Sequence, residues 1–272
     1  MNITAKTNIC MIIGDPVEHS ISPQMHNACY KALGIDKEFI FLAAHVSPQN
    51  LEHAIQGIRA LGIHAVTVTI PHKTAVIGLL DAIDPIAEKI GAVNTIVNKN
   101  GKLTGFNTDW IGIDKSLKKI INLKNKKAAI LGAGGAARAA ICTVKKFGAQ
   151  VYIFNRTAEN AKMLAEEFQT EYDSIDKIES ILTCDVIINT TSVGLNSDET
   201  PIPSDAIRKE QIVFDIIYTP FETQLLKLAK GKGACVIHGT DMLLYQAIAQ
   251  FNIYTGRSAP EEVMRKAIIE NL

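Results

Sequence analysis

The sequence predicts an α/β protein made of two successive sets of alternating strands and helices. Short apolar and β-branched runs alternate with helical stretches over most of the 272 residues, a pattern typical of parallel sheets covered by helices. A glycine-rich turn, Gly132–Gly135, lies between a strand and a helix of the second set. From composition, the polar, lysine-rich stretch over residues 118–127 is the expected boundary between the two sets.

The first set begins with three expected strands, at Ile9–Ile13, Phe39–Val46 and Ala65–Ile70, with helices over Pro23–Leu33 and Pro48–Leu61 between them. Residues 94–98 and 103–106 flank Asn100-Gly101 and predict a hairpin, because this dipeptide accepts the positive φ angles of a two-residue turn. A helix is expected over residues 109–121, with Thr108 or Asp109 as its N-cap.

The second set has expected strands at Ala128–Leu131, Val151–Phe154, Asp185–Asn189, Ile212–Ile217 and Ala234–Ile237. Helices are expected over residues 136–147 and 158–168, and again from residue 241 onward. The alternation predicts a parallel sheet.

Composition excludes several function classes. Basic and acidic residues balance at 28 each, so we expect no binding to nucleic acid or acidic membranes. No apolar run reaches the length of a membrane span, and the first residues do not resemble a secretion signal. Five scattered cysteines without a Cys-x-x-Cys pair, and no histidine pair with metal spacing, predict no disulfides and no metal site. We therefore expect a cytoplasmic protein; its oligomeric state is left open, a homodimer included.

The glycine turn predicts a dinucleotide site. Gly132-x-Gly134-Gly135-x-Ala137 matches the fingerprint in which the first glycine makes the turn and the second lets the backbone approach a pyrophosphate. The expected contacts come from the backbone of the turn and the helix start, namely Gly132, Ala133, Gly134, Gly135 and Ala136. A tight turn without a ligand is the alternative.

The end of the next strand favours NADP over NAD. NAD-binding folds often place an acid there for the ribose hydroxyl, whereas this chain has Asn155-Arg156-Thr157. An arginine between two short polar side chains can accept a 2′-phosphate through charge-assisted hydrogen bonds. Thr157 also has the position of a helix N-cap, and both interpretations can hold together.

Polar side chains follow the strands of the first set. Ser20 and Ser22 precede a helix and could bind a carboxylate or merely cap the helix. Thr69 and Lys73 lie at the carboxyl end of the third strand, where open α/β sheets bind ligands. The ammonium group of Lys73 could polarise a carbonyl or donate a proton, although an isolated lysine is more often solvated. His72 is expected at the surface.

Two further segments are polar in the same way. Asp109 provides a carboxylate at a strand-to-helix junction, where it could equally be a cap. Asn94 places an amide at a strand start.

These segments, taken in order, resemble the shikimate dehydrogenase family over essentially the whole chain. The resemblance is carried by eight motifs: Gly14-Asp15-Pro16 with Ser20-Ile21-Ser22-Pro23, Val68–Lys73, Gly91–Thr95, Asn107-Thr108-Asp109, Gly132–Ala137, Asn155-Arg156-Thr157, Asp215-x-x-Tyr218-x-Pro220, and Met242-Leu243 with Gln246.

The resemblance implies a reversible, NADPH-dependent reduction of 3-dehydroshikimate to shikimate, a step in the biosynthesis of chorismate and aromatic amino acids. It also implies a discontinuous substrate domain, residues 1–108 with 240–272, around a Rossmann-type NADP-binding domain, residues 109–239. Lys73 would transfer the proton and Asp109 would orient it together with the ring hydroxyl. The remaining expected contacts are Ser20 and Ser22 to the carboxylate, Thr69, Asn94, Tyr218 and Gln246 to the ring hydroxyls and carboxylate, and Ile216 and Gly239 to the cofactor.

The chain departs from the family pattern at three positions. Thr67 stands where asparagine is frequent, Asn160 where arginine or lysine is common, and Asp241 where glycine is common. The 2′-phosphate would then rest mainly on Arg156, with help from Lys162.

Two rival functions follow from the same residues. One is a quinate/shikimate dehydrogenase that uses NAD, against which Arg156 and the pair Ser20 and Ser22 argue. The other is a non-catalytic sensor of shikimate-like ligands, against which the retention of Lys73 and Asp109 argues.

Overall fold

The computed structural model describes residues 3–272 and divides into two compact units. Unit 1 comprises the described residues up to Thr108 together with Leu244–Asn271, and unit 2 comprises Asp109–Leu243 with Leu272. Residues 118–127, the boundary expected from composition, lie inside unit 2, where they connect helix α4 (Asp109–Lys118) to strand β7 (Lys127–Leu131). The stretch is polar because it is a surface connection.

The sheet of unit 1 has the strand order β2-β1-β3-β5-β6-β4. Strands β1 (Asn8–Gly14), β2 (Phe39–His45) and β3 (Ala65–Val68) run parallel, whereas β5 (Thr95–Lys99) is antiparallel to both β3 and β6 (Lys102–Phe106), and β4 (Ala82–Ile83) pairs parallel with β6. The sheet is thus mixed rather than parallel throughout. The predicted hairpin causes this, with φ of 55° at Asn100 and 83° at Gly101.

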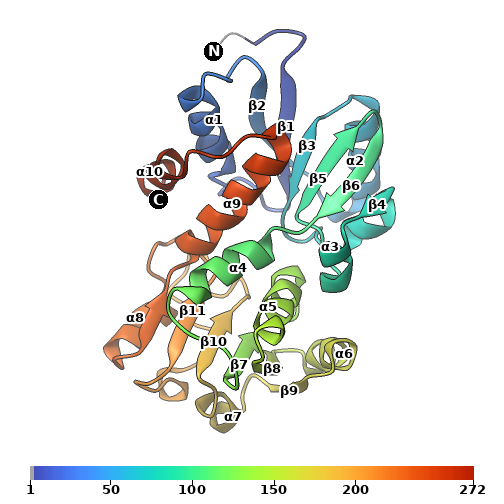
Figure 1. Ribbon diagram of the computed structural model, residues 1–272. Helices are drawn as coiled ribbons and strands as arrows, with labels where there is room; N and C mark the ends of the chain where they lie inside the picture. Colours follow the sequence, from blue (N-terminus) through green and yellow to red (C-terminus); the bar gives the residue numbers. More distant parts are fainter. Residues whose placement is uncertain (1–2) are drawn as a thin grey trace. The chain divides into compact units, whose positions relative to one another are not determined.

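Helices cover both faces of this sheet. The apolar side of α2 (Leu51–Ala60), which follows the short 3-10 helix Pro48–Asn50, packs with Ile13, Val66 and Ile96 on one face. The opposite face meets α1 (Ser22–Ala32) and the unit 1 part of α9 (Gly239–Thr255), and α10 (Glu261–Glu270) lies beside α1 (Figure 1). A 3-10 helix at Ala75–Leu79 and helix α3 (Pro85–Ile90) complete the unit.

An aromatic cluster fills the face between α1, β2 and α9. The ring of His26 stacks on Phe41 with centroids 4.3 Å apart and also faces Phe251 at 6.1 Å. His26 is fully buried, and neither ring nitrogen has a hydrogen-bond partner among the described residues. Burial lowers the pKa of His26 to about 3, so the imidazole is neutral in the folded protein.

Unit 2 contains one parallel sheet of six strands in the order β12-β11-β10-β7-β8-β9. The strands are β7, β8 (Gln150–Asn155), β9 (Glu171–Ser174), β10 (Val186–Asn189), β11 (Ile212–Asp215) and β12 (Cys235–Ile237). Read from β9, the chain order is third, second, first, fourth, fifth, sixth, which is the doubly wound dinucleotide-binding topology. The order reverses between β7 and β10, where such folds bind their ligand.

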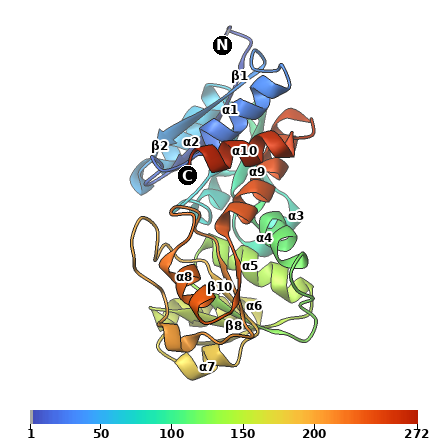
Figure 2. The same cartoon turned by 90° about the vertical axis from the view of Figure 1, so that its left-hand side faces the viewer.

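Two groups of helices cover this sheet. Helix α5 (Gly135–Lys146) packs on β7 and β8 beside α4, and α6 (Ala158–Phe168) packs on β8 and β9. The other face carries α7 (Ile178–Leu182), the 3-10 helix Ser204–Ala206 and α8 (Gln224–Gly231) around an apolar core that includes Leu131, Ile187 and Val213. Figure 2 shows α8 and α5 on opposite sides of the strands.

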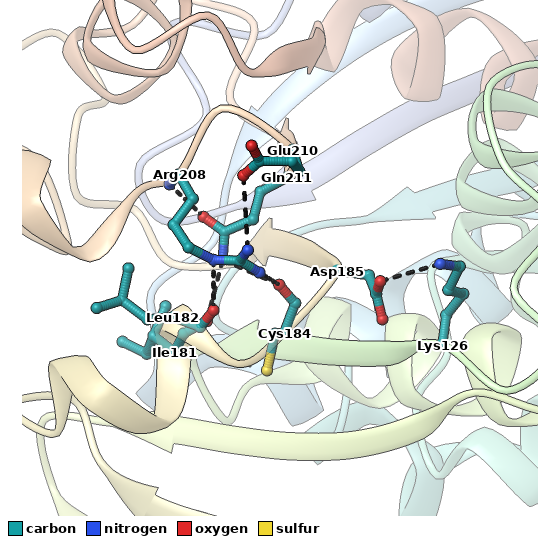
Figure 3. A network of polar contacts seen from close by, with 8 residues as sticks. All are labelled: Lys126, Ile181, Leu182, Cys184, Asp185, Arg208, Glu210 and Gln211. Carbon is teal, nitrogen blue, oxygen red and sulfur yellow. Dashed lines mark hydrogen bonds and ion pairs between the residues drawn. The ribbon is translucent and has the colours of Figure 1, made fainter.

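A polar network ties together the amino ends of these strands (Figure 3). Gln211 Nε2 donates to the carbonyls of Ile181 and Cys184 at 3.1 and 2.9 Å, and Arg208 Nε donates to Leu182 O at 2.6 Å. Beside them, Asp185 accepts from Lys126 Nζ at 3.0 Å. The network lies at the end of the sheet opposite the glycine turn, and we assign it a role in stability.

Within residues 3–272, no helix combines the length and the apolar character needed to cross a membrane.

Candidate functional site

One edge of the unit 1 sheet collects most of the polar residues expected from the sequence. Strands β1 and β3 run parallel and end at this edge, and β5 starts there because Thr95 pairs with Thr67 and Phe106. Segments that are distant in sequence therefore converge on the edge: residues 15–22 after β1, 69–73 after β3, Asn94 before β5, and 107–108 after β6.

The loops after β1 and β3 lie in direct contact. A Cβ added at Gly14 would lie 2.4 Å from the Thr69 methyl group and 3.0 Å from Ile70 O, so only glycine fits here. Asp15 N donates to Ile70 O at 2.9 Å. Farther along the β1 loop, the hydroxyl groups of Ser20 and Ser22 are 3.1 Å apart, with Ser22 at the start of α1. The two serines thus present adjacent hydroxyls at a helix N-terminus.

Lys73 is half-buried, and its carbonyl accepts from Val93 N at 2.7 Å. This bond attaches the lysine's turn to the segment that leads into Asn94. The expectation that His72 lies at the surface is wrong. His72 is only 1% exposed, and its Nε2 donates to Val46 O at 2.7 Å, because the turn after β3 folds inward and the ring anchors it to the end of β2.

Asn94 makes hydrogen bonds through its side chain and its backbone. Its Oδ1 accepts from Thr108 N at 2.8 Å and from Thr95 Oγ1 at 2.7 Å, and its Nδ2 donates to Thr108 Oγ1 at 3.0 Å. Its backbone accepts from Val68 N at 2.8 Å and donates to Phe106 O at 3.0 Å. The side chain is 2% exposed, so its orientation is fixed by the protein.

Thr108 brings Gln246 into the same set of contacts. The Thr108 hydroxyl lies 3.5 Å from Gln246 Oε1, which comes from the unit 1 part of α9. Asp109 follows Thr108 directly as the first residue of α4 and is 3% exposed. The N-cap alternative for Asp109 is therefore wrong by one position, since the residue lies within the helix.

Sequence reasoning missed a buried extension of this cluster. Gln250 and Tyr254 lie one and two turns beyond Gln246 on α9 and are 0% and 2% exposed. Gln250 contacts Thr67, Thr95 and the Asn94 carbonyl, and Tyr254 OH lies 2.8 Å from Thr67 Oγ1. Only the helical spacing of 246, 250 and 254 could have indicated that these residues share a face.

In unit 2 the glycine turn lies at the reversal of strand order. Gly132 has a φ of 110°, and its N–H donates to Phe154 O at 2.7 Å. A Cβ there would lie 2.8 Å from Thr190 Oγ1, whereas a Cβ at Gly134, just before α5, would meet nothing within 4 Å. The first glycine is thus required by the turn, and the second leaves open space beside a helix N-terminus.

The strand after the turn ends where the phosphate-binding residues are expected. Asn155 Nδ2 donates to Thr157 O at 2.9 Å. Thr157 is the N-cap of α6 by position, but its side chain makes no capping hydrogen bond. Arg156 is exposed, and no ion pair or hydrogen bond to another described residue holds its guanidinium.

A second polar group lies at the carboxyl ends of β10 and β11, and of its members only Asp215 belongs to a motif noted in the sequence. Asn189 Nδ2 donates to Asp215 Oδ1 at 3.0 Å, and Thr223 Oγ1 donates to Asp215 Oδ2 at 2.7 Å. Burial raises the pKa of Asp215 to about 6. The polar run after β10 was a usable signal. These bonds fix the loops beside the glycine turn, including the segment that carries Ile216 and Tyr218.

The backbone around Gly239 leaves no room for a side chain at this position. A Cβ there would lie 2.3 Å from Ile217 O and 2.5 Å from Ile216 O, so the start of α9 passes directly over this backbone. Tyr218, one residue farther, is half-buried, and desolvation raises the pKa of its phenol. Among the described residues, no group of His, Cys, Asp and Glu side chains could hold a metal ion.

Unit 2 is a dinucleotide-binding domain, as its sheet topology, its glycine turn and the open space before the N-terminus of α5 define it. It is joined to an α/β unit whose sheet has a polar edge. Three family models match parts of the chain. Residues 12–96 match the shikimate dehydrogenase substrate binding domain, residues 115–217 match shikimate / quinate 5-dehydrogenase, and residues 239–269 match the shikimate 5'-dehydrogenase C-terminal domain.

Whole-chain similarities identify the family. A protein of Methanosphaera stadtmanae named shikimate dehydrogenase (NADP(+)) is 44% identical over 99% of both chains. A crystal structure of a shikimate dehydrogenase in complex with NADP+ is 41% identical with a TM-score of 0.91, covering 99% of this chain and 97% of that one. The Thermus thermophilus enzyme in complex with NADP(H) and shikimate is 34% identical with a TM-score of 0.88, covering 98% and 100%.

The chain belongs to the shikimate dehydrogenase family. This confirms both the family and the fold class predicted from the sequence.

Proposed function

We propose that this chain is an NADP-dependent shikimate dehydrogenase, which interconverts 3-dehydroshikimate and shikimate in the biosynthesis of chorismate and aromatic amino acids. One observation carries the proposal: the carboxyl edge of the unit 1 sheet brings together serine, threonine and asparagine side chains with one lysine. A small ring acid with several hydroxyl groups requires such a set of short donors and acceptors. The NADP-named relatives support the choice of cofactor.

The residues of unit 2 fit NADP. The open space at Gly134 lies before the N-terminus of α5, where backbone N–H groups can bind a pyrophosphate. Residues Gly132 to Ala136 would hold this group, with Asn155, Arg156 and Thr157 at the 2′-phosphate, and Ile216 and Gly239 beside the nicotinamide. When bound, the nicotinamide supplies or accepts the hydride.

The chain's own side chains supply position and charge. Ser20 and Ser22 bind the substrate carboxylate, and Thr69, Asn94, Tyr218 and Gln246 orient the ring. Lys73 donates a proton to the ketone oxygen during reduction and removes it during oxidation. Its ammonium also stabilises the negative charge that develops on that oxygen. This stabilisation is stronger in the transition state than in the ground state. Asp109 orients Lys73 and the adjacent hydroxyl.

The domain limits follow from the same proposal. Residues 1–108 and 240–272 form the substrate domain, and residues 109–239 form the NADP-binding domain. We place the enzyme in the cytoplasm. A homodimer stays a prediction that light scattering of the purified chain can test.

The decisive experiment measures the change in nicotinamide absorbance with shikimate or quinate, each with NADP or NAD. We expect the highest kcat/KM with shikimate and NADP. Preferential turnover of quinate with NAD would instead identify the quinate/shikimate type. Tight binding of shikimate without turnover in any combination would identify a sensor.

A further inference from the structure

A chain of hydrogen bonds runs through the interior of unit 1 and ends on Asn94. Its members are Tyr254, Thr67, Gln250 and Thr95, of which Tyr254 and Gln250 lie on α9, Thr67 on β3 and Thr95 on β5. All four are at most 5% exposed. None has a place in the proposed catalytic or binding set, so their burial requires another explanation.

The direction of each bond follows from atoms that have a single possible role. The Asn94 backbone carbonyl can only accept, so the Gln250 atom 3.3 Å from it is the amide nitrogen. Gln250 Oε1 must then face Thr67, whose hydroxyl donates to it at 3.2 Å. Since the single Thr67 proton is used, Tyr254 OH donates to Thr67 Oγ1 at 2.8 Å.

The same reasoning fixes the other half of the chain. Gln250 Nε2 also donates to Thr95 Oγ1 at 3.1 Å, so the Thr95 proton is left to point to Asn94 Oδ1, 2.7 Å away. Thr108 N, which can only donate, lies 2.8 Å from the same Oδ1. Tyr254 thus donates to Thr67, and Thr67 donates to Gln250. Gln250 donates to Thr95, and Thr95 donates to Asn94 Oδ1, which favours one orientation of the Asn94 amide.

We propose that Gln250, acting through Thr95, is a positioning residue that holds Asn94 with its amide nitrogen toward the substrate edge. This inference rests on the proposed function, because it assigns a role toward the substrate that Asn94 is proposed to bind. Asn94 Oδ1 accepts from Thr95 and from Thr108 N, while Nδ2 donates to Thr108 Oγ1. The group that Asn94 presents to a substrate hydroxyl is therefore its amide nitrogen, a donor. Gln250 supports this orientation through Thr95, in addition to the bond from Thr108 N, and touches no substrate itself.

Four variants test the proposal. Thr95→Val removes the last donor with little change of shape, Gln250→Met removes the central amide, and Tyr254→Phe removes the distant phenol. In Gln250→Glu, an ionised carboxylate cannot donate to Thr95, and it draws the Thr95 proton away from Asn94. Thr143→Val is the matched control, because Thr143 is a similarly buried hydroxyl whose only bond within residues 3–272 goes to its own helix carbonyl, Ala139 O, at 2.7 Å.

For Thr95→Val and Gln250→Met we expect the KM for shikimate to rise about five- to tenfold, the usual effect of losing one oriented neutral hydrogen bond. Tyr254→Phe should give a smaller rise because it lies at the far end of the chain. The KM for NADP should stay unchanged in all of them. Gln250→Glu should gain a pH dependence, with a KM for shikimate that rises as the buried acid ionises, and Thr143→Val should change neither KM.

Thermal unfolding of each variant separates position from stability. If Thr95→Val and Gln250→Glu lower the unfolding temperature but keep the wild-type KM for shikimate at every pH, the chain of bonds is structural only and the inference is overturned. Should Gln250→Met fail to fold, the conservative Thr95→Val and Tyr254→Phe variants still show whether the chain of hydrogen bonds affects the KM for shikimate. An inactive wild-type protein would instead overturn the proposed function, so the two failures are distinguishable.

Discussion

The carbonyl oxygen of Ile217 lies where a side chain at Gly239 would begin, 2.3 Å from the position of its Cβ. Gly239→Ala must therefore displace the start of α9 or the backbone of residues 216–217. We expect a loss of stability of about 1–3 kcal/mol, the usual cost of overpacking, together with a higher KM for NADP. Chemical denaturation and steady-state kinetics measure the two effects, and an unchanged denaturation midpoint would contradict the first.

Gly134→Ala should raise the KM for NADP without the loss of stability. A Cβ at this position meets nothing within 4 Å, and its φ of −93° suits any residue. Stability should stay within about 0.5 kcal/mol of wild type, while the methyl group should raise the KM for NADP because it fills the space proposed for the pyrophosphate. The KM for shikimate is the internal control. Equal NADP binding in variant and wild type would place the pyrophosphate elsewhere.

Replacing the proposed proton-transfer pair should affect turnover rather than folding. Lys73→Ala should lower kcat by about 10²- to 10⁴-fold, the usual contribution of a general acid or base, with a smaller change in the KM for shikimate. Asp109→Asn should also lower kcat, and Lys99→Ala, at the exposed end of the hairpin, is the control. Near-normal kcat in Lys73→Ala would exclude the lysine from proton transfer.

Arg156 should set the preference for NADP. Since no described residue pairs with its exposed guanidinium, Arg156→Gln should leave the unfolding temperature unchanged. It should raise the KM for NADP about tenfold or more, as expected for a charge-assisted bond, without changing the KM for NAD. Asn160→Arg should strengthen the preference, and Lys232→Gln controls for the loss of one surface charge. Equal effects on both cofactors would exclude contact with the 2′-phosphate.

His26 should make the protein sensitive to acid. Its pKa is lowered by burial from 6.5 to about 3, so below pH 6.5 the unfolded chain gains a proton that the folded chain does not. Stability is therefore lost as the pH falls from 6.5 toward 3, by about 2 kcal/mol at pH 5.

His26→Phe, which can stack on Phe41 without burying two unpaired nitrogens, should remove this loss. The test is the free energy of unfolding of both proteins at pH 5 and pH 7. Asp215, whose pKa is raised to about 6, weakens stability in the opposite direction as the pH rises from about 4 to about 6. Its contribution cancels in the difference between variant and wild type. A difference that is the same at both pH values would contradict the role of His26.

The sequence predicts strongly periodic elements well and polar or short ones poorly. Helix α6 occupies the predicted residues, and β7 and β10 lie within one residue of theirs, because their apolar spacing is determined by burial. Strand β9 was missed since its residues are polar and half or fully exposed. Helix α3 was also missed, although it carries usable signals: Asp84 caps Ile86 N, Pro85 starts the helix, and Gly91 ends it with a φ of 68°.

The candidate site divides in the same way. The glycine turn was predictable because its residues are adjacent and its chemistry is local. The contact of Gln250 with Thr67 joins residues 183 positions apart, and His72 contacts Val46 across 26 positions. No local pattern encodes such pairs, since each depends on how the whole unit folds. The pairing of Lys73 with Asp109 was predicted only from the resemblance to a family, and not from any pattern in the residues themselves.

Unit 1 combines residues up to Thr108 with residues 244–271, so it can be completed only after unit 2 has been synthesised. Unit 2 is almost continuous, so it can fold on the ribosome as soon as residue 243 has emerged, as domains commonly do. The first 108 residues must wait, because Gln250, Tyr254 and the partner of α1, helix α10, are synthesised after residue 243. During that interval the apolar face of α1 and the inner hydroxyls of β3 and β5 lack their native cover, and exposed apolar surface of this kind favours aggregation.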